Sequence, residues 1–189
     1  MIEYPDWVTV VALTRDERRL LTVREYRHGV GAIMKGLPGG LVDRGDGRLR
    51  LSAAEVAARR ELLEETGFGG GRLECLVATH PNPSIQTNAA FCFLATDLIR
   101  QRSVAIGESV EVIEDDLALL LDQLREGALA MHAVHVAALW SAAARIISDN
   151  SGRFGTLPFA LRRLLTRESV ERSPASTIRI GAPGSMVGG

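Results

Sequence analysis

Three closely spaced glutamates carry the clearest chemical signal in the chain. Glu61, Glu64 and Glu65 stand at positions i, i+3 and i+4 of a segment with helical character, so their carboxylates should project from one helix face. Like charges at this spacing repel by about 0.2–0.5 kcal/mol per pair, and the helix macrodipole disfavours anions near its C-terminal end. A solvated acidic face is one interpretation of the trio. The other is a site for a hard divalent cation, whose charge would relieve the repulsion.

The segments on either side of the trio favour a site. Pro38, Gly39 and Gly40 precede it, and backbone without side chains can approach a ligand and offer a carbonyl oxygen to a metal. The helix itself is predicted over 52–66. Ser52 with Glu55 three residues later forms a capping box, and Gly67 stands where a left-handed residue ends a helix.

These residues fall into a recognisable pattern. The run Gly40-x5-Asp46 followed by Arg60-Glu61-Leu62-x-Glu64-Glu65-x-Gly67-Phe68 resembles the Nudix box. The second half matches at every fixed acidic, Arg and Gly position. The first half departs twice, since Asp46 replaces a Glu and thirteen rather than seven residues separate it from Arg60. The segments 21–27 and 37–43 are similar to those of the ADP-ribose pyrophosphatase branch of this family.

The resemblance implies a fold, an activity and a metal. The fold would be an α/β/α sandwich with a mixed β-sheet. The activity would be hydrolysis of the diphosphate bond in a nucleoside diphosphate linked to another moiety, with ADP-ribose or a related nucleotide sugar first, giving AMP and ribose 5-phosphate from ADP-ribose. Mg²⁺ or Mn²⁺ would neutralise and orient the diphosphate. By resemblance its ligands are Glu61, Glu64, Glu65 and the Gly39 carbonyl.

The resemblance also suggests catalytic and substrate-binding residues. The candidate catalytic residues are Arg60, Glu64 and Glu108, with Arg60 pairing with a box carboxylate and Glu108 acting as the general base. Glu111 is the alternative base, and an exposed loop glutamate is the alternative interpretation of Glu108. The candidate substrate-binding residues are Gly40 and, from the chemistry of their own side chains, Tyr26 and Arg27, which could stack on a base or grip a phosphate. A strand-end aromatic beside a solvated Arg is an equal interpretation of Tyr26 and Arg27.

Composition limits the classes of function. Of the 189 residues, 46% are hydrophobic and 24% charged, which is the mixture of a globular domain with a buried core. The net charge of -1 argues against a nucleic-acid surface, and two cysteines are too few for a disulfide framework. The N-terminus lacks the pattern of a signal peptide, and no apolar stretch is long enough to span a bilayer. We therefore expect a cytoplasmic protein that contacts neither nucleic acid nor membrane.

Element patterns and composition predict two regions. Residues 1–149 form the Nudix domain, and residues 150–189 form a C-terminal extension, helical over 157–172 and flexible afterwards. Strands are expected at 7–13, 20–26, 72–79, 89–96 and 110–113, and helices at 52–66, 115–125 and 130–148. A Gly-rich connection is expected between residues 26 and 37.

Two further expectations concern the helix at 130–148. Its apolar faces indicate core or a subunit interface, and we expect a homodimer in which Glu108 approaches the metal site of its own or the partner chain. The His132-x-x-His135 pair favours surface or interface histidines over a metal site, because no acidic partner accompanies it. The alternatives to the diphosphatase are a Nudix-fold ligand sensor or binding protein without catalysis, and a Nudix hydrolase of nucleoside triphosphates.

Overall fold

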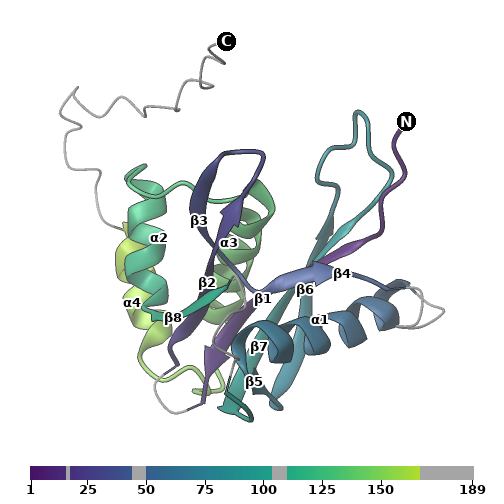
Figure 1. The fold of residues 1–189 in the computed structure, drawn as a ribbon. Helices are drawn as coiled ribbons and strands as arrows, with labels where there is room; N and C mark the ends of the chain where they lie inside the picture. The colour runs from purple at the N-terminus through teal and green to yellow at the C-terminus, as the bar shows by residue number, and fades with distance from the viewer. Residues whose placement is uncertain (16–17, 44–49, 104–109, 167–189) are drawn as a thin grey trace, which may run out of the picture.

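The computed structural model describes residues 1–15, 18–43, 50–103 and 110–166 (Figure 1). The strands are β1 (Trp7–Thr14), β2 (Leu20–Arg27), β3 (Ala32–Gly36), β4 (Gly39–Leu41), β5 (Phe68–Gly69), β6 (Arg72–Thr79), β7 (Ala90–Arg100) and β8 (Glu111–Asp115). The helices are α1 (Arg50–Thr66), α2 (Leu117–Arg125), α3 (Ala133–Ile147) and α4 (Leu157–Thr166).

The sheet is mixed, as the resemblance predicted. Strand β1 runs parallel to β7, and the other pairings are antiparallel. The β1–β2 hairpin is paired only where Ala12 faces Leu21 and Leu13 faces Leu20. Beyond those pairs β4 takes the place beside the start of β1, and β3 takes the place beside the end of β2. Residues 36–39 therefore carry the chain from its place beside β2 to its place beside β1. Residues 38–40 are called the glycine loop below.

Helices cover both faces of the sheet, which makes the predicted α/β/α sandwich (Figure 1). Alternate residues of β1 enter two different cores, because successive side chains of a strand point to opposite faces. Val10 packs with Ala57 and Leu62 of α1, whereas Val11 packs with Leu139 of α3. Helices α2 and α4 complete the layer that contains α3.

Some element boundaries differ from the sequence expectations. Strand β3 replaces the expected Gly-rich connection, because its backbone pairs with β2 over Ala32–Gly36. Helix α1 is described from Arg50, so Ser52 lies within its first turn and is not the expected cap. Gly67 does adopt the predicted left-handed conformation, with φ of 73°. Its N–H donates to the carbonyl oxygen of Leu63 at 3.0 Å and ends the helix.

The described part of the C-terminal extension belongs to the same core as the preceding domain. Phe154, Leu161 and Leu164 are buried among residues of α2 and α3. Residues 167–172 of the expected helix and the expected flexible end at 173–189 lie outside the described residues. No helix among the described residues has the length and apolar character needed to cross a membrane.

Candidate active site

The glycine loop meets two of the three glutamates of α1. The Gly39 N–H donates to Glu65 Oε2 at 2.9 Å. A Cβ on Gly40 would lie 2.4 Å from the carboxyl carbon of Glu61, so only a glycine leaves room for that carboxylate. A Cβ on Gly39 would lie 2.1 Å from the Val8 carbonyl oxygen of β1. Both carboxylates therefore lie against backbone that can carry no side chain.

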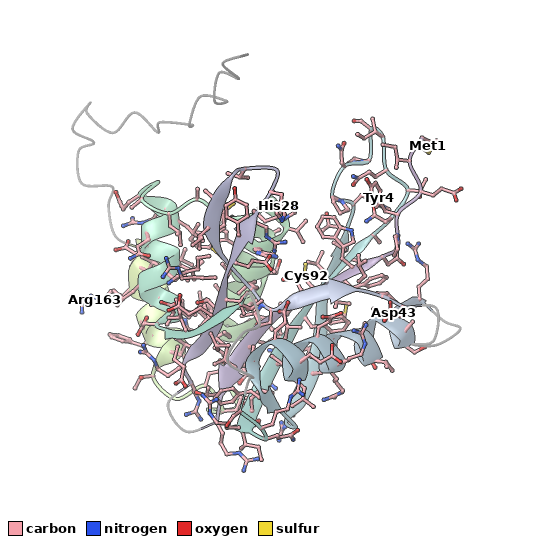
Figure 2. The ribbon with its side chains drawn as sticks, in the orientation of Figure 1. Met1, Tyr4, His28, Asp43, Cys92 and Arg163 are labelled. Atoms are coloured by element: carbon pink, nitrogen blue, oxygen red, sulfur yellow. The ribbon has the colours of Figure 1, made fainter. Side chains whose placement is uncertain are left out.

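Arg60 links α1 to the segment after the glycine loop. Its Nη1 lies 2.7 Å from Glu61 Oε1 and 3.5 Å from Glu64 Oε2. Its Nη2 donates to the Leu41 carbonyl oxygen at 3.0 Å and lies 3.1 Å from Asp43 Oδ2. Figure 2 shows Asp43 beyond β4, beside the N-terminal half of α1. The guanidinium thus holds the Glu61 carboxylate, which also lies against Gly40.

The two carboxylates are electrostatically coupled. Burial raises the pKa of the Glu65 carboxyl to about 7; the Gly39 N–H opposes this shift, and the charge of Glu61 adds to it. Burial also raises the pKa of Glu61, against the lowering effect of Arg60. A half-buried pair of like charges held against backbone is unfavourable by itself and suits a hard divalent cation. The donor set therefore fits Mg²⁺ or Mn²⁺.

Glu64 is placed differently from its two neighbours. Its side chain is 54% exposed, against 16% for Glu61, and it turns toward Arg60. Among the residues that the structure describes, no three His, Cys, Asp or Glu side chains converge in an arrangement that could hold a metal ion. The helix thus brings Glu61 and Glu65 together, whereas Glu64 lies against Arg60 and away from them.

The candidate bases lie apart from this cluster or outside the described residues. Glu108, the candidate base, lies outside the described residues, and so does Asp46, the acidic residue in the first half of the box. Glu111 begins β8 and faces Arg24 of β2, with Glu111 Oε2 3.1 Å from Arg24 Nη1. The side chain of Glu111 is 64% exposed and forms an ion pair with Arg24.

The two candidate substrate residues on β2 have different surroundings. Arg27 pairs with Glu25, and both charges act on Glu65, so this end of β2 lies beside the carboxylates. Tyr26 is 53% exposed and lies edge-on to His28, with the ring centroids 5.1 Å apart. Figure 2 shows His28 at the upper end of the β2–β3 hairpin. The structure thus brings Arg27, and not Tyr26, toward the carboxylates.

A pocket beside the carboxylates is lined by two histidines, His132 and His135, which the sequence analysis did not assign to the site. The pocket of about 380 Å³ lies between the β2–β3 hairpin and the start of α3. His135 is only 8% exposed and accepts a hydrogen bond from the Leu37 N–H through Nδ1, at 3.2 Å. His132 precedes α3, with its ring 5.3 Å from Trp7 and 5.4 Å from His135. The expectation of a surface histidine is therefore wrong for His135.

Comparison with known proteins decides the family. The model of the NUDIX domain matches residues 4–132, which is more than half of the chain. The chain belongs to the NUDIX family. The ADP-ribose pyrophosphatase of Bacillus subtilis (strain 168) is 30% identical over 131 residues, which cover 67% of each chain. The GDP-mannose pyrophosphatase of Enterobacter sp. (strain 638) is 29% identical over 124 residues, which cover 63% of this chain and 64% of that protein.

A solved structure agrees with this assignment. The crystal structure of an ADP compounds hydrolase superposes with a TM-score of 0.62 at 27% identity, covering 75% of this chain and 72% of the other. Together with the family match and the pyrophosphatase relatives, this neighbour identifies the protein as a Nudix hydrolase.

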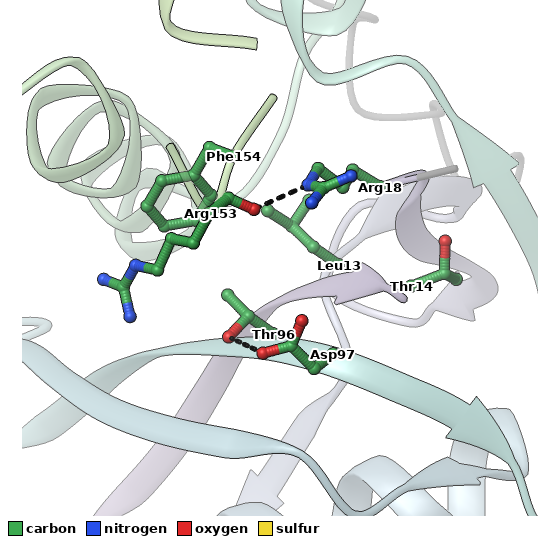
Figure 3. Close-up of a pocket in the computed structure, with 7 residues that line it drawn as sticks. All are labelled: Leu13, Thr14, Arg18, Thr96, Asp97, Arg153 and Phe154. Atoms are coloured by element: carbon green, nitrogen blue, oxygen red, sulfur yellow. Dashed lines mark hydrogen bonds between the residues drawn. The ribbon is translucent and has the colours of Figure 1, made fainter. Parts of the chain in front are cut away.

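A second hollow lies at the other end of β1 from the carboxylates of α1, which is called the Nudix helix below (Figure 3). Arg18 donates through Nε to the Arg153 carbonyl oxygen at 2.8 Å, and Thr96 donates to Asp97 Oδ2 at 3.4 Å. The Arg18 contact joins the β1–β2 connection to the segment before α4. The residues that line this hollow connect the segment before α4 to the sheet, and they lie outside the carboxylate cluster.

Proposed function

We propose that this Nudix hydrolase cleaves the diphosphate bond of a nucleoside diphosphate linked to another moiety, in a reaction that depends on Mg²⁺ or Mn²⁺. ADP-ribose or a related nucleotide sugar is the proposed substrate, and ADP-ribose would give AMP and ribose 5-phosphate. Two pyrophosphatase relatives support this substrate class. Their names differ in the base, so they support a nucleotide sugar without choosing between adenine and guanine.

The contact between the glycine loop and the Nudix helix carries the proposal. Glu65 accepts from the Gly39 N–H, and Glu61 fills the space that a side chain at residue 40 would take. Glu61, Glu64, Glu65 and the Gly39 carbonyl are the proposed ligands. A bound divalent cation neutralises charge on the diphosphate and orients it for attack by water.

The remaining roles are proposed from the described contacts around this site and, for Glu108, from the sequence resemblance alone. Arg60 holds the Glu61 carboxylate in place and is proposed as a positioning residue rather than a group that meets the substrate. Glu64 acts as a ligand once it leaves Arg60. Glu108 is the proposed general base, and Glu111 is its alternative. Arg27 and Gly40 are the proposed substrate contacts near the carboxylates, and Tyr26 is a proposed contact from the neighbouring strand position.

A substrate panel tests the proposal. The full chain is incubated with ADP-ribose, GDP-mannose and the common nucleoside triphosphates, each with Mg²⁺, Mn²⁺ or excess EDTA, and the products are identified by chromatography. We expect turnover of a diphosphate-linked compound with either metal and loss of turnover in EDTA. Full activity in EDTA refutes metal dependence. Preferred turnover of the triphosphates supports the alternative of a Nudix hydrolase that acts on nucleoside triphosphates. Tight binding of a compound without turnover of any compound supports a ligand sensor.

The association state is proposed separately. We propose a homodimer in the cytoplasm, with Glu108 near the metal site of its own or the partner chain, and with a small nucleotide as the ligand rather than nucleic acid or membrane. Size-exclusion chromatography with light scattering measures the mass of the active species. A monomer of 20.4 kDa with full activity refutes the pairing.

A further inference from the structure

The pocket beside the carboxylates has a lining that suits a flat, uncharged ring. Most of its accessible surface is apolar, and Val30, Met34 and Met131 are its apolar side chains. Its volume of about 380 Å³ falls in the range of small-molecule sites. The two long cationic side chains at its wall are already engaged, since Arg27 contacts Glu25 and the Lys35 Nζ lies 2.8 Å from Asp115 Oδ2. This lining therefore favours a base over a phosphate group.

Its polar side chains are all potential donors. The described lining includes His28, His132 and His135 with Arg27 and Lys35, and it includes no Asp, Glu, Asn, Gln, Ser or Thr side chain. The hydroxyls of a sugar would need acceptors as well as donors. A ring edge with acceptor atoms matches the lining better than a sugar does.

Backbone contacts fix the hydrogen position on two of these histidines. The Leu37 N–H donates to Nδ1 of His135 at 3.2 Å, and the Val134 N–H donates to Nδ1 of His132 at 3.2 Å. A nitrogen that accepts a hydrogen bond carries no hydrogen, so each ring is neutral and has its hydrogen on Nε2. Neither Nε2 bonds to another described residue. Both rings can therefore donate to a ligand.

We propose that this pocket seats the base of the substrate and that His135, donating through Nε2, selects bases with a keto oxygen, guanine or hypoxanthine, over adenine. The inference rests on the proposed function, because the diphosphate must lie at the carboxylates for the base to reach the pocket. Guanine presents two acceptors, O6 and N7, on one edge, whereas adenine presents N7 beside an amino donor. On this edge the adenine amino group faces donors, and the described lining offers it no side-chain acceptor.

Binding with Mg²⁺ present tests the selectivity, and chromatography of the nucleotides after each titration checks that they remain uncleaved. Calorimetry with the full chain compares GDP, IDP and ADP, which share the diphosphate and differ in the base. We expect GDP and IDP to bind with similar affinity and about tenfold or more tighter than ADP, the scale of one well-made base contact. Equal affinity for IDP and ADP, or tighter binding of ADP, overturns the proposal.

Two substitutions then test the residue. His135→Asn places an amide near the Nδ1 position, so it keeps an acceptor for Leu37 and removes the Nε2 donor. We expect the preference for GDP over ADP to fall to less than about threefold. His135→Gln restores a donor near Nε2 and should recover part of the preference. His80→Asn is the control, because His80 binds the Asn88 carbonyl oxygen away from the pocket. An unchanged preference in a folded His135→Asn protein overturns the role of His135.

The binding assay and the turnover assay fail independently. If the keto preference is present but no diphosphate compound is hydrolysed with metal, the proposed function fails and the base pocket stands. If nucleotide sugars are hydrolysed but wild-type GDP, IDP and ADP bind equally, the base pocket fails and the function stands. Should both histidine variants unfold, the comparison of IDP with ADP on the wild-type chain still decides the selectivity.

Discussion

Replacing Gly40 by alanine tests the geometry of the proposed metal site most directly. The new Cβ would lie 2.4 Å from the Glu61 carboxyl carbon and 2.5 Å from its Oε1, whereas ordinary contacts begin at 3.4 Å. The carboxylate must therefore retreat by about 1 Å (3.4 minus 2.4). A shift of this size in a catalytic constellation costs roughly 10²-fold in rate. We expect kcat/KM to fall by about this factor with Mg²⁺ present.

The fold should tolerate this substitution. Glu61 presents the far end of a flexible side chain, and Gly40 lacks the positive φ that would strain an alanine. The melting temperature should stay within about 4 °C of wild type, which corresponds to roughly 1 kcal/mol in a chain of this size. Gly69→Ala in β5 is the matched control. Its new Cβ would lie 2.7 Å from Gln101 Oε1, which is likewise the end of a movable side chain. This control should keep full activity.

A double mutant separates the mechanism from a general disturbance. If Gly40→Ala acts by displacing Glu61, it should cost little more in a Glu61→Ala protein, because the displaced group is already gone. Steady-state kinetics on the four proteins gives the coupling. Wild-type activity of Gly40→Ala, or an equal further loss in the Glu61→Ala background, would refute the reasoning.

Three other predictions address single groups. Glu65→Gln should lower kcat by about 10²-fold or more in the turnover assay. It should also raise the melting temperature in EDTA at pH 8, because the elevated pKa of Glu65 means that its charged form destabilises the metal-free fold. An unchanged kcat at saturating metal would show that Glu65 is not a metal ligand. Burial lowers the pKa of His135 to about 3, so below pH 6.5 the unfolded chain binds a proton on this residue that the folded chain does not bind. In denaturant titrations, the free energy of unfolding of the wild type should therefore fall by about 2 kcal/mol relative to His135→Asn between pH 7.5 and pH 5. Parallel pH profiles of the two proteins would contradict this. Glu108→Gln should lower kcat with little change in substrate affinity; if Glu111→Gln alone lowers kcat, the base was assigned to the wrong residue.

Local patterns predicted the Nudix helix well because its signals are local. The i, i+3, i+4 spacing of the glutamates and the glycine at residue 67 depend only on helix geometry, and the structure has both. The capping prediction at Ser52 was wrong, because a Ser followed by Glu is also compatible with the first turn of a helix that starts earlier. Such boundary signals are weaker than the periodicity within the helix.

Long-range contacts were beyond the reach of the sequence patterns. Strand β3 forms because its backbone pairs with β2, although the Gly residues around it indicated a connection. The pocket needs Leu37 and His135, which are 98 residues apart in the chain. The His132-x-x-His135 spacing was visible in the sequence. The lack of an acidic partner argued against a metal site, but it carried no signal for the backbone contacts that the two rings make. The 8% exposure of His135 depends on the packing of α3 against the sheet, which no local pattern encodes.

The charges around the site are the physical reason for proposing a cation together with a diphosphate substrate. Arg27 of β2, whose charge acts on Glu65, already contacts Glu25, and Lys35 is held by Asp115. Glu61 and Glu65 add two carboxylates where the diphosphate would have to lie. Without a cation, the substrate would therefore meet repulsion that the neighbouring basic side chains cannot offset. The same carboxylates become favourable once a divalent ion lies between them and the phosphates, so acidic residues and an anionic substrate are compatible at one site.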